Sequence, residues 1–140
     1  MNTPLRNTLK KSERLYSKVA IDRLFLGESW SVAAFPIRAV FRLDDFFETD
    51  KEAQAAIMIS VPKRHLHHAV DRNRVKRQIR EFYRKNKTFL WQAIENKNKK
   101  LSIAFIWLDG KLWSSSDVEK KLSVLFHRME EKIQKEFNEK

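Results

Sequence analysis

Two groups of side chains have the types needed for catalysis or metal binding. These are the histidines at positions 65, 67 and 68 and the adjacent carboxylates of Asp44 and Asp45. Neither group has the spacing of a recognised metal site such as His-Glu-x-x-His, and no second ligand cluster accompanies them. The absence of cysteine excludes disulfides and thiolate metal sites. We expect His65, His67 and His68 to be surface or ligand-contacting residues and the aspartates to be solvated, so the sequence predicts neither catalytic nor metal-binding residues.

The chemistry that the sequence does favour is the binding of a polyanion. Residues 71–85, DRNRVKRQIREFYRK, hold seven Lys or Arg in fifteen positions. Residues 61–87 hold ten Lys or Arg and two Asp or Glu, so this segment carries a net charge of +8 of the chain's +11. An excess of this size indicates nucleic acid or an anionic membrane surface as the partner. The segment 44–52 is acidic, and we expect it to be a solvated turn between strands.

The basic segment has the periodicity of a helix. At about 100° per residue, Val75, Ile79, Phe82, Tyr83, Phe89 and Ala93 share one apolar face. The opposite face holds Asn73, Lys76, Arg77, Arg80, Arg84 and Lys87. Asp71 is predicted to be the N-cap, and Glu81 to pair with Arg77 and Lys85 at i,i+4. A merely solvated face is the alternative, but five cations without an acid destabilise an isolated protein, which favours binding to phosphates.

The remaining chain predicts a single α+β domain over residues 1–140. Residues 1–8 are expected to be a flexible N-terminus, and residues 128–140 a charged helical extension. Residues 17–26 are expected to be a helix with Ser17 as a cap, and its Ile21, Leu24 and Phe25 share one face. Strands are predicted at 32–43, 55–61 and 101–108. In the first of these strands, one side holds Phe35, Ile37, Ala39 and Phe41. Pro36 in the same strand favours an edge position or a bulge.

The last predicted element is a helix that begins with a capping box at Ser116 and Glu119. Its apolar face repeats at helical spacing through Val118, Leu122, Leu125 and Met129. The basic helix is flanked by two predicted strands, so we expect it to be a crossover helix packed on a sheet. A helix held in this way favours contact with a folded RNA through shape and phosphates over entry into a DNA groove. An RNA-binding module without a catalytic partner and a sequence-specific DNA-binding protein stay open as alternatives.

Several motifs resemble those of one known family. Val61-Pro62-Lys63-Arg64 is followed after seven residues by Arg72-Asn73-Arg74-Val75-Lys76-Arg77 and then by Arg80-Glu81. The start Lys10 to Leu15, and the short helix ending in Leu24-Phe25, fit the same pattern. In these motifs, and in the order of elements from about Leu9 to Phe126, the chain resembles the protein subunit of bacterial ribonuclease P.

The resemblance implies a fold and a function. The fold would be a two-layer α/β sandwich, ribosomal-protein-S5-domain-2-like, with a left-handed βαβ crossover, a rare exception to the usual hand. The function would be to bind the catalytic RNA subunit and the 5′ leader of precursor tRNA in an endonuclease holoenzyme, a hydrolase for tRNA processing. The RNA with bound Mg²⁺ would perform the hydrolysis, and the chain alone would not be catalytic. No membrane or protein partner is implied, and because the sequence shows no signal peptide or membrane-spanning run we expect a cytoplasmic ribonucleoprotein.

The same resemblance assigns residues to two surfaces. The residues expected to contact the RNA subunit are Arg72, Asn73, Arg74, Lys76, Arg77 and Arg80, with Lys63 and Arg64 near the same junction. Phe25 and Ile21 are expected in the leader cleft, with Arg38 on the neighbouring strand. The sequence departs from the family pattern at Pro62, where many members have Ser, at Arg64, where the family has Lys, and at Ile21, where an aromatic residue is common. Ile21 and Phe25 also fit a purely structural role in the core.

Overall fold

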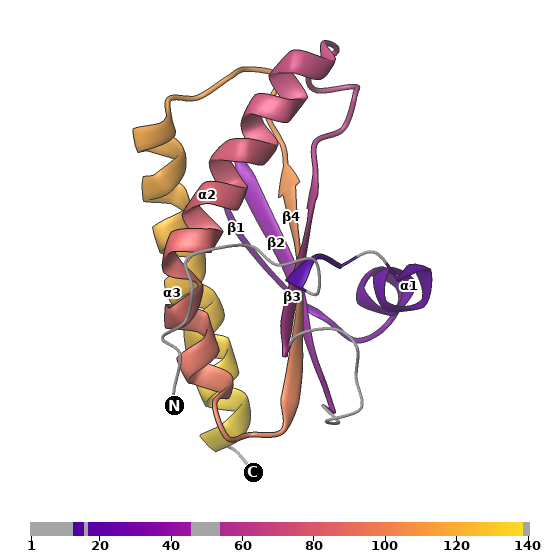
Figure 1. The fold of residues 1–140 in the computed structure, drawn as a ribbon, viewed down its shortest axis with the longest axis vertical. Coiled ribbons are helices and arrows are strands. Elements are labelled where there is room, and N and C mark those ends of the chain that lie inside the picture. Colours follow the sequence, from indigo (N-terminus) through magenta and orange to yellow (C-terminus); the bar gives the residue numbers. More distant parts are fainter. Residues whose placement is uncertain (1–12, 16, 46–53, 139–140) are drawn as a thin grey trace, which may run out of the picture.

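The protein is an α/β sandwich in which helices cover a single mixed sheet (Figure 1). The computed structural model describes residues 13–15, 17–45 and 54–138. In chain order the elements of this part are α1 (Lys18–Leu26), β1 (Trp30–Ala34), β2 (Ile37–Asp45), β3 (Ala55–Ser60), α2 (Ala69–Ile94), β4 (Lys99–Trp107) and α3 (Ser115–Asn138).

The sheet has the strand order β1-β2-β4-β3. β2 pairs antiparallel with β1 and β4, whereas β3 pairs parallel with β4. Because α2 connects β3 to β4, it is the crossover helix that the sequence predicts. α2 and α3 pack side by side on one face of the sheet, and the short α1 lies on the other face (Figure 1). None of the described helices is long and apolar enough to cross a membrane.

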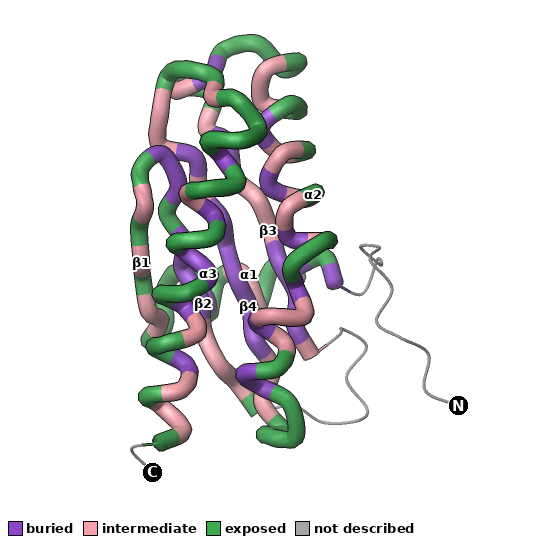
Figure 2. The backbone as a smooth tube through the Cα atoms, turned by 90° about the vertical axis from the view of Figure 1, so that its left-hand side faces the viewer, coloured by how far each residue is buried: buried purple, intermediate pink, exposed green. Residues whose placement is uncertain are grey.

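Alternation along the strands sends side chains into a separate core on each face. On β2, Ile37, Ala39 and Phe41 are buried in the large core with α2 and α3, and Val40 is buried in a smaller core with Leu24 of α1. The two helices that form the large core turn their buried sides to the sheet and to each other (Figure 2). The four residues Val118, Leu122, Leu125 and Met129 are all fully buried, which confirms the apolar face predicted for the last helix.

The segment 32–43 is a hairpin and not the single strand that its alternation predicts. Phe35 and Pro36 form the turn between β1 and β2, and Ala34 pairs directly with Ile37. Proline has no N–H for a ladder hydrogen bond, and here the chain reverses direction instead of continuing through it. As a consequence Phe35 lies at the surface, whereas Ile37, Ala39 and Phe41 are buried as expected.

The start of α1 agrees with the prediction, whereas the starts of α2 and α3 differ from it. Ser17 caps α1 by accepting a hydrogen bond from the Ala20 N–H. α2 begins earlier than expected, with His68 as N-cap, so Asp71 lies in the first turn, where a carboxylate complements the positive end of the helix. α3 also begins earlier, because the Ser114 hydroxyl accepts from the Asp117 N–H, so the predicted capping box is wrong.

The end of the chain contributes to the core. Residues 128–138 continue α3 without a break, and Met129 and Ile133 are buried while Phe137 packs against the large core. The predicted flexible segment 1–8 and most of the acidic segment 44–52 lie outside the described residues. Asp44 and Asp45, which are described, belong to β2.

Candidate nucleic-acid interface

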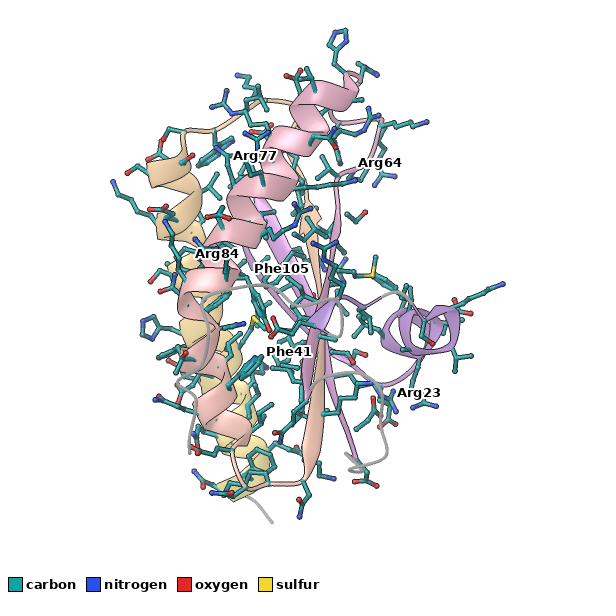
Figure 3. The ribbon with its side chains drawn as sticks, viewed as in Figure 1. Arg23, Phe41, Arg64, Arg77, Arg84 and Phe105 are labelled. Carbon is teal, nitrogen blue, oxygen red and sulfur yellow. The ribbon has the colours of Figure 1, made fainter. Side chains whose placement is uncertain are left out.

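The long helix α2 holds most of the predicted RNA-contacting residues on its outer side. Val75, Ile79 and Tyr83 are fully buried and fix the rotation of the helix against the sheet. The side chains turned away from this core in the first half of the helix form the α2 basic surface: Asn73, Arg74, Lys76, Arg77 and Arg80. Figure 3 shows Arg77 and Arg84 along α2 and Arg64 on the segment that leads into it.

Lys87 is an exception to the predicted charged face. Its Nζ donates to both carboxylate oxygens of Glu13, at 3.0 and 3.1 Å, and both side chains are 2% exposed. The same Nζ lies 5.0 Å from the centroid of the Trp91 ring. The prediction that Lys87 faces outward is therefore wrong, because a segment far away in the sequence covers it and supplies its counter-ion.

Arg72 has a structural contact that the sequence does not reveal. One of its terminal nitrogens donates to the carbonyl oxygens of Leu66 at 2.9 Å and His67 at 2.8 Å. These bonds tie the segment before α2 to the first turn of the helix. Lys63 and Arg64, which are both exposed, belong to that segment. Arg72 thus helps to fix the segment that carries Lys63 and Arg64 to the start of α2.

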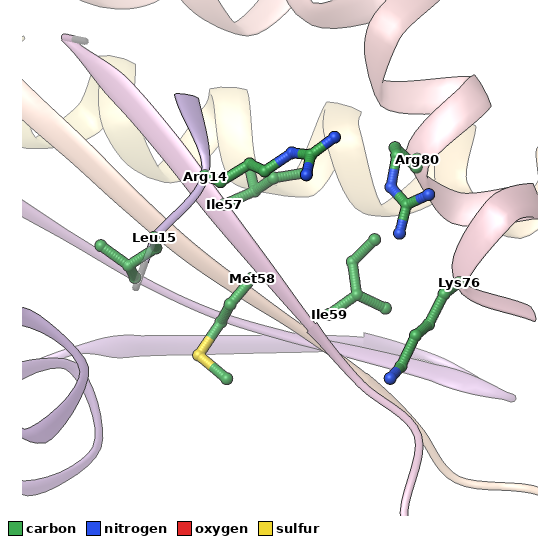
Figure 4. Close-up of a pocket in the computed structure, with 7 residues that line it drawn as sticks. All are labelled: Arg14, Leu15, Ile57, Met58, Ile59, Lys76 and Arg80. Carbon is green, nitrogen blue, oxygen red and sulfur yellow. The ribbon is translucent and has the colours of Figure 1, made fainter. Parts of the chain in front are cut away.

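A groove lies between the α2 basic surface and the edge strand β3 (Figure 4). It has a volume of about 270 Å³, and its lining residues form the β3 groove: Arg14, Leu15, Ile57, Met58, Ile59, Lys76 and Arg80. Lys76 and Arg80 extend from α2 toward β3, and the Arg14 guanidinium extends from the other side. Three cations therefore border an apolar floor, a combination that suits a single nucleic-acid strand because the cations attract phosphates and the apolar surface accepts bases.

Arg14 is a member of this groove that the sequence analysis missed as a site residue. It forms a parallel bridge with Ile57, and the adjacent Leu15 N–H donates to the Ile57 carbonyl oxygen at 2.7 Å. Glu13 and Leu15 are buried and Arg14 between them is exposed. The available signal was that Arg14 lies within the Lys10 to Leu15 segment that fits the family pattern. The burial of Glu13 depends on its contact with Lys87 and has no local sign in the sequence.

A second cleft lies on the opposite border of the α2 basic surface, against the start of α3. It has a volume of about 440 Å³ and is lined by Arg74, Arg77, Gln78, Glu81, Lys85, Ser115 and Glu119. Glu81 pairs with Arg84 at 2.9 Å and not with Arg77 or Lys85 as predicted. The hydrogen bond from Arg84 lowers the pKa of Glu81 and raises the pKa of Arg84. Glu81 is thus paired with a cation of its own helix. Arg74 and Arg77, which line this cleft from the first half of α2, are exposed.

The three residues predicted for the leader cleft lie on or near the sheet face that α1 covers. Ile21 is half-buried and packs against the small core, as does Met58 of the β3 groove. Arg38 is exposed on β2, where its Nε donates to the Ser31 hydroxyl at 2.8 Å. Its partner on β4 is Ile106, which packs against the same small core. Phe25 is 46% exposed and belongs to neither core, so the structural alternative fails for it.

The two aspartates considered for metal binding form ion pairs instead. Asp44 accepts from the Arg42 Nε at 2.8 Å, and Asp45 accepts from the Lys99 Nζ at 2.7 Å. His67 and His68 are exposed and His65 is half-buried. Within residues 13–15, 17–45 and 54–138 no group of three His, Asp or Glu side chains could hold a metal ion.

An α/β sandwich that carries cations on its crossover helix, next to an apolar groove, has the features expected of the class of nucleic-acid-binding proteins. The comparison with family models narrows this class. The model of the family Ribonuclease P matches residues 9–130. The chain belongs to the ribonuclease P protein family.

Relatives with established names agree with this membership. The chain is 35% identical over 122 residues to the ribonuclease P protein component of Porphyromonas gingivalis strain ATCC 33277, which covers 87% of this chain and 86% of that protein. The protein of strain W83 matches to the same extent. Among solved structures, the RNase P protein of Staphylococcus aureus has a TM-score of 0.63 at 21% identity and covers 85% of this chain and 96% of its own. That of Thermotoga maritima has a TM-score of 0.61 at 24% identity, with coverage of 83% and 96%, and these two likenesses show the fold.

Proposed function

We propose that this chain binds the catalytic RNA of ribonuclease P and the 5′ leader of precursor tRNA, and so assists endonucleolytic removal of the leader. The observation that carries the proposal is that the α2 basic surface borders the β3 groove, so that one helix offers cations to two different regions. Membership of the ribonuclease P protein family supports the choice of RNA over DNA. The mature 5′ end of the tRNA is the product.

The RNA subunit would bind along the outer side of α2. Asn73, Arg74 and Arg77 are exposed there, and no acid lies between Asn73 and Arg77 in the sequence. Arginine can form two parallel hydrogen bonds to a phosphate, and the asparagine amide can bond a base edge, a ribose or a phosphate. Lys63 and Arg64, held nearby through Arg72, would extend the same contact. This surface supplies charge to offset the phosphates of a folded RNA.

The leader would bind in the β3 groove and toward α1. Lys76 and Arg80 are half-buried and point into the groove, so their cations are less available to the RNA subunit than those of Arg74 and Arg77. Met58 joins the groove to the small core against which Ile21 packs. A single strand that follows this path would meet an apolar floor and then α1, where Phe25 offers an aromatic ring. Arg38 lies on the same face of the sheet and would contact a phosphate.

The chemistry belongs to the RNA in this proposal. Mg²⁺ bound by the RNA subunit would activate the water and stabilise the phosphoryl transition state. The residues of this chain bind and orient the substrate and offset the phosphate charge that would otherwise keep two RNA molecules apart. This role raises substrate affinity without a catalytic side chain in the protein.

The test is reconstitution with a ribonuclease P RNA at a low Mg²⁺ concentration. Cleavage of a precursor tRNA with a radiolabelled 5′ end is measured with and without the protein. We expect the protein to increase the cleavage rate and to bind the RNA with a steep dependence on salt. A protein that binds the RNA without improving cleavage would be an RNA-binding module with another role, and a protein that does not bind it would contradict the proposal altogether.

A further inference from the structure

Two aromatic side chains meet at the end of the sheet next to the first half of α2. Phe35 lies in the turn between β1 and β2 and is 54% exposed. Trp113 lies between β4 and α3 and is half-buried. Their ring centroids are 6.2 Å apart at an interplanar angle of 66°, an edge-to-face contact. Leu112, at the margin of the same loop, is also exposed. Single exposed apolar residues are common, but this pair joins two segments that are far apart in the sequence.

Four hydrogen bonds hold this pair in place. The Arg74 guanidinium donates to the Trp113 carbonyl oxygen at 3.5 Å. The Trp113 indole N–H donates to the Asp109 carboxylate at 2.8 Å. The Gln78 amide of α2 donates to the Trp113 carbonyl oxygen at 3.0 Å. The Leu108 N–H donates to the Pro36 carbonyl oxygen at 2.8 Å, which fixes the turn that carries Phe35. A rigid ring loses little entropy when a ligand stacks on it, so this anchoring favours binding.

The pair is continuous with the α2 basic surface. Gln78 belongs to the cleft that Arg74 and Arg77 line, and it is the same residue that holds Trp113. Lys111 in the loop is exposed as well. Asp109, the acid that contacts Trp113, is engaged by the indole N–H. An aromatic surface bordered by exposed cations suits a nucleobase flanked by phosphates better than an apolar protein surface.

We propose that Phe35 and Trp113 form a platform on which an unpaired base of the RNA subunit stacks while the α2 basic surface binds the adjoining phosphates. This inference rests on the proposed function, because it takes the RNA subunit as the occupant. The platform would bind the RNA by stacking, in addition to the charged contacts of the α2 basic surface. Every base has an aromatic face, so the platform tolerates different bases and requires only that the base is unpaired.

The platform and the basic surface respond differently to salt. A stacked base releases no counter-ions, whereas each phosphate contact contributes about one to the slope of log K against log salt concentration. Loss of one stacked base weakens binding roughly 5- to 150-fold. Replacement of Phe35 should therefore lower the affinity for the RNA and leave the salt slope as it is. Replacement of Arg77 should lower both the affinity for the RNA and the salt slope.

The experiment measures the affinity of the full chain for a ribonuclease P RNA at several salt concentrations. The variants are Phe35→Ala, Phe35→Leu and Phe35→Tyr. Leu keeps an apolar side chain without an aromatic face, and Tyr keeps the aromatic face. Val124→Ala is the matched control, because Val124 is an exposed apolar residue on α3 in a different region. Thermal unfolding checks that all variants fold, and Phe35→Tyr keeps the test valid if the smaller side chains reduce stability.

We expect Phe35→Ala and Phe35→Leu to bind 5- to 150-fold more weakly with an unchanged salt slope, and Phe35→Tyr and Val124→Ala to bind like the wild type. Wild-type affinity in Phe35→Ala, or full affinity in Phe35→Leu, would overturn the platform even if Arg77→Ala weakens binding as expected. Failure of the wild type to bind the RNA would instead overturn the proposed function. Quenching of Trp113 fluorescence by the RNA, obtained from the difference between the wild type and Trp113→Phe, provides an independent readout, and its absence would also contradict the platform.

Discussion

Lys87 and Glu13 form a buried ion pair across 74 positions of sequence, with both oxygens of the carboxylate accepting from the Lys87 Nζ. The pair attaches the segment before α1 to the second half of α2. Leu15 of this segment bonds to β3, and Arg14 between them lines the β3 groove. The ion pair therefore helps to position one wall of the groove in which we place the leader.

Removal of one partner of this pair should be costly. Glu13→Gln or Lys87→Met leaves a buried charge without its counter-ion, and we expect a loss of about 3–5 kcal/mol in the free energy of unfolding. The double variant Glu13→Gln/Lys87→Met should recover part of that loss, because no lone charge is left in the interior. Urea denaturation measures both. Glu81→Gln is the control, since Glu81 forms an exposed pair with Arg84. Equal, small effects for all variants would show that the buried pair does not stabilise the protein.

The sequence predicts the large elements because their periodicity is local. The apolar faces of α2 and α3 follow from side chains three and four positions apart, and packing against the sheet satisfies them as expected. Lys87 could not be placed in this way. On the helical wheel it lies about 40° beyond Tyr83, at the border of the apolar face. Which side of that border is covered depends on Glu13, and nothing local to α2 indicates that contact. The hairpin at Phe35 and Pro36 was missed for a related reason, since the alternation of side chains continues on both sides of the turn.

Arg72 and Arg77 should behave differently although both belong to the predicted RNA-binding set. Arg77 is exposed, and Arg77→Ala should weaken binding of the RNA subunit and reduce the salt slope by about one with little change in stability. Arg72 bonds to Leu66 and His67, so Arg72→Ala should also lower the melting temperature. Salt-dependent filter binding and thermal unfolding separate the two effects. An Arg72→Ala variant as stable as Arg77→Ala would argue against the structural role.

Tyr83 should make stability sensitive to alkaline pH. Burial is the largest cause that raises the pKa of its hydroxyl above the ordinary tyrosine value of 10.0. The folded state therefore disfavours the phenolate, and the contribution to stability is complete below pH 10 and is lost as the pH rises through the raised folded pKa. In Tyr83→Phe this loss should be absent, so urea denaturation at pH 7 and pH 10.5 should show a smaller decrease than in the wild type. The other alkaline groups are common to both proteins, so an identical decrease would contradict the assignment.

Only part of the candidate site could be predicted from the sequence. The motif Arg72 to Arg77 identifies the helix and its charge, because a run of cations on one face is a local feature. The division of these cations between two borders depends on what packs beside the helix. Lys76 and Arg80 meet β3 and Arg14, whereas Arg74 and Arg77 meet the start of α3. These contacts connect residues separated by 17 or more positions, so they follow from the topology of the sheet and not from the motif.

Phe25 offers the sharpest test of the leader surface. The side chain is about half exposed and belongs to neither core, so Phe25→Ala should leave the protein folded. If a leader base stacks on the ring, the variant should bind precursor tRNA more weakly by about 1–3 kcal/mol and bind mature tRNA as before. Leu26→Ala is a matched control, because Leu26 is the adjacent residue and is also exposed. Both substrates are titrated against the reconstituted holoenzyme. An equal loss for mature tRNA would place Phe25 outside the leader path, and a loss of melting temperature in Phe25→Ala alone would return it to a structural role.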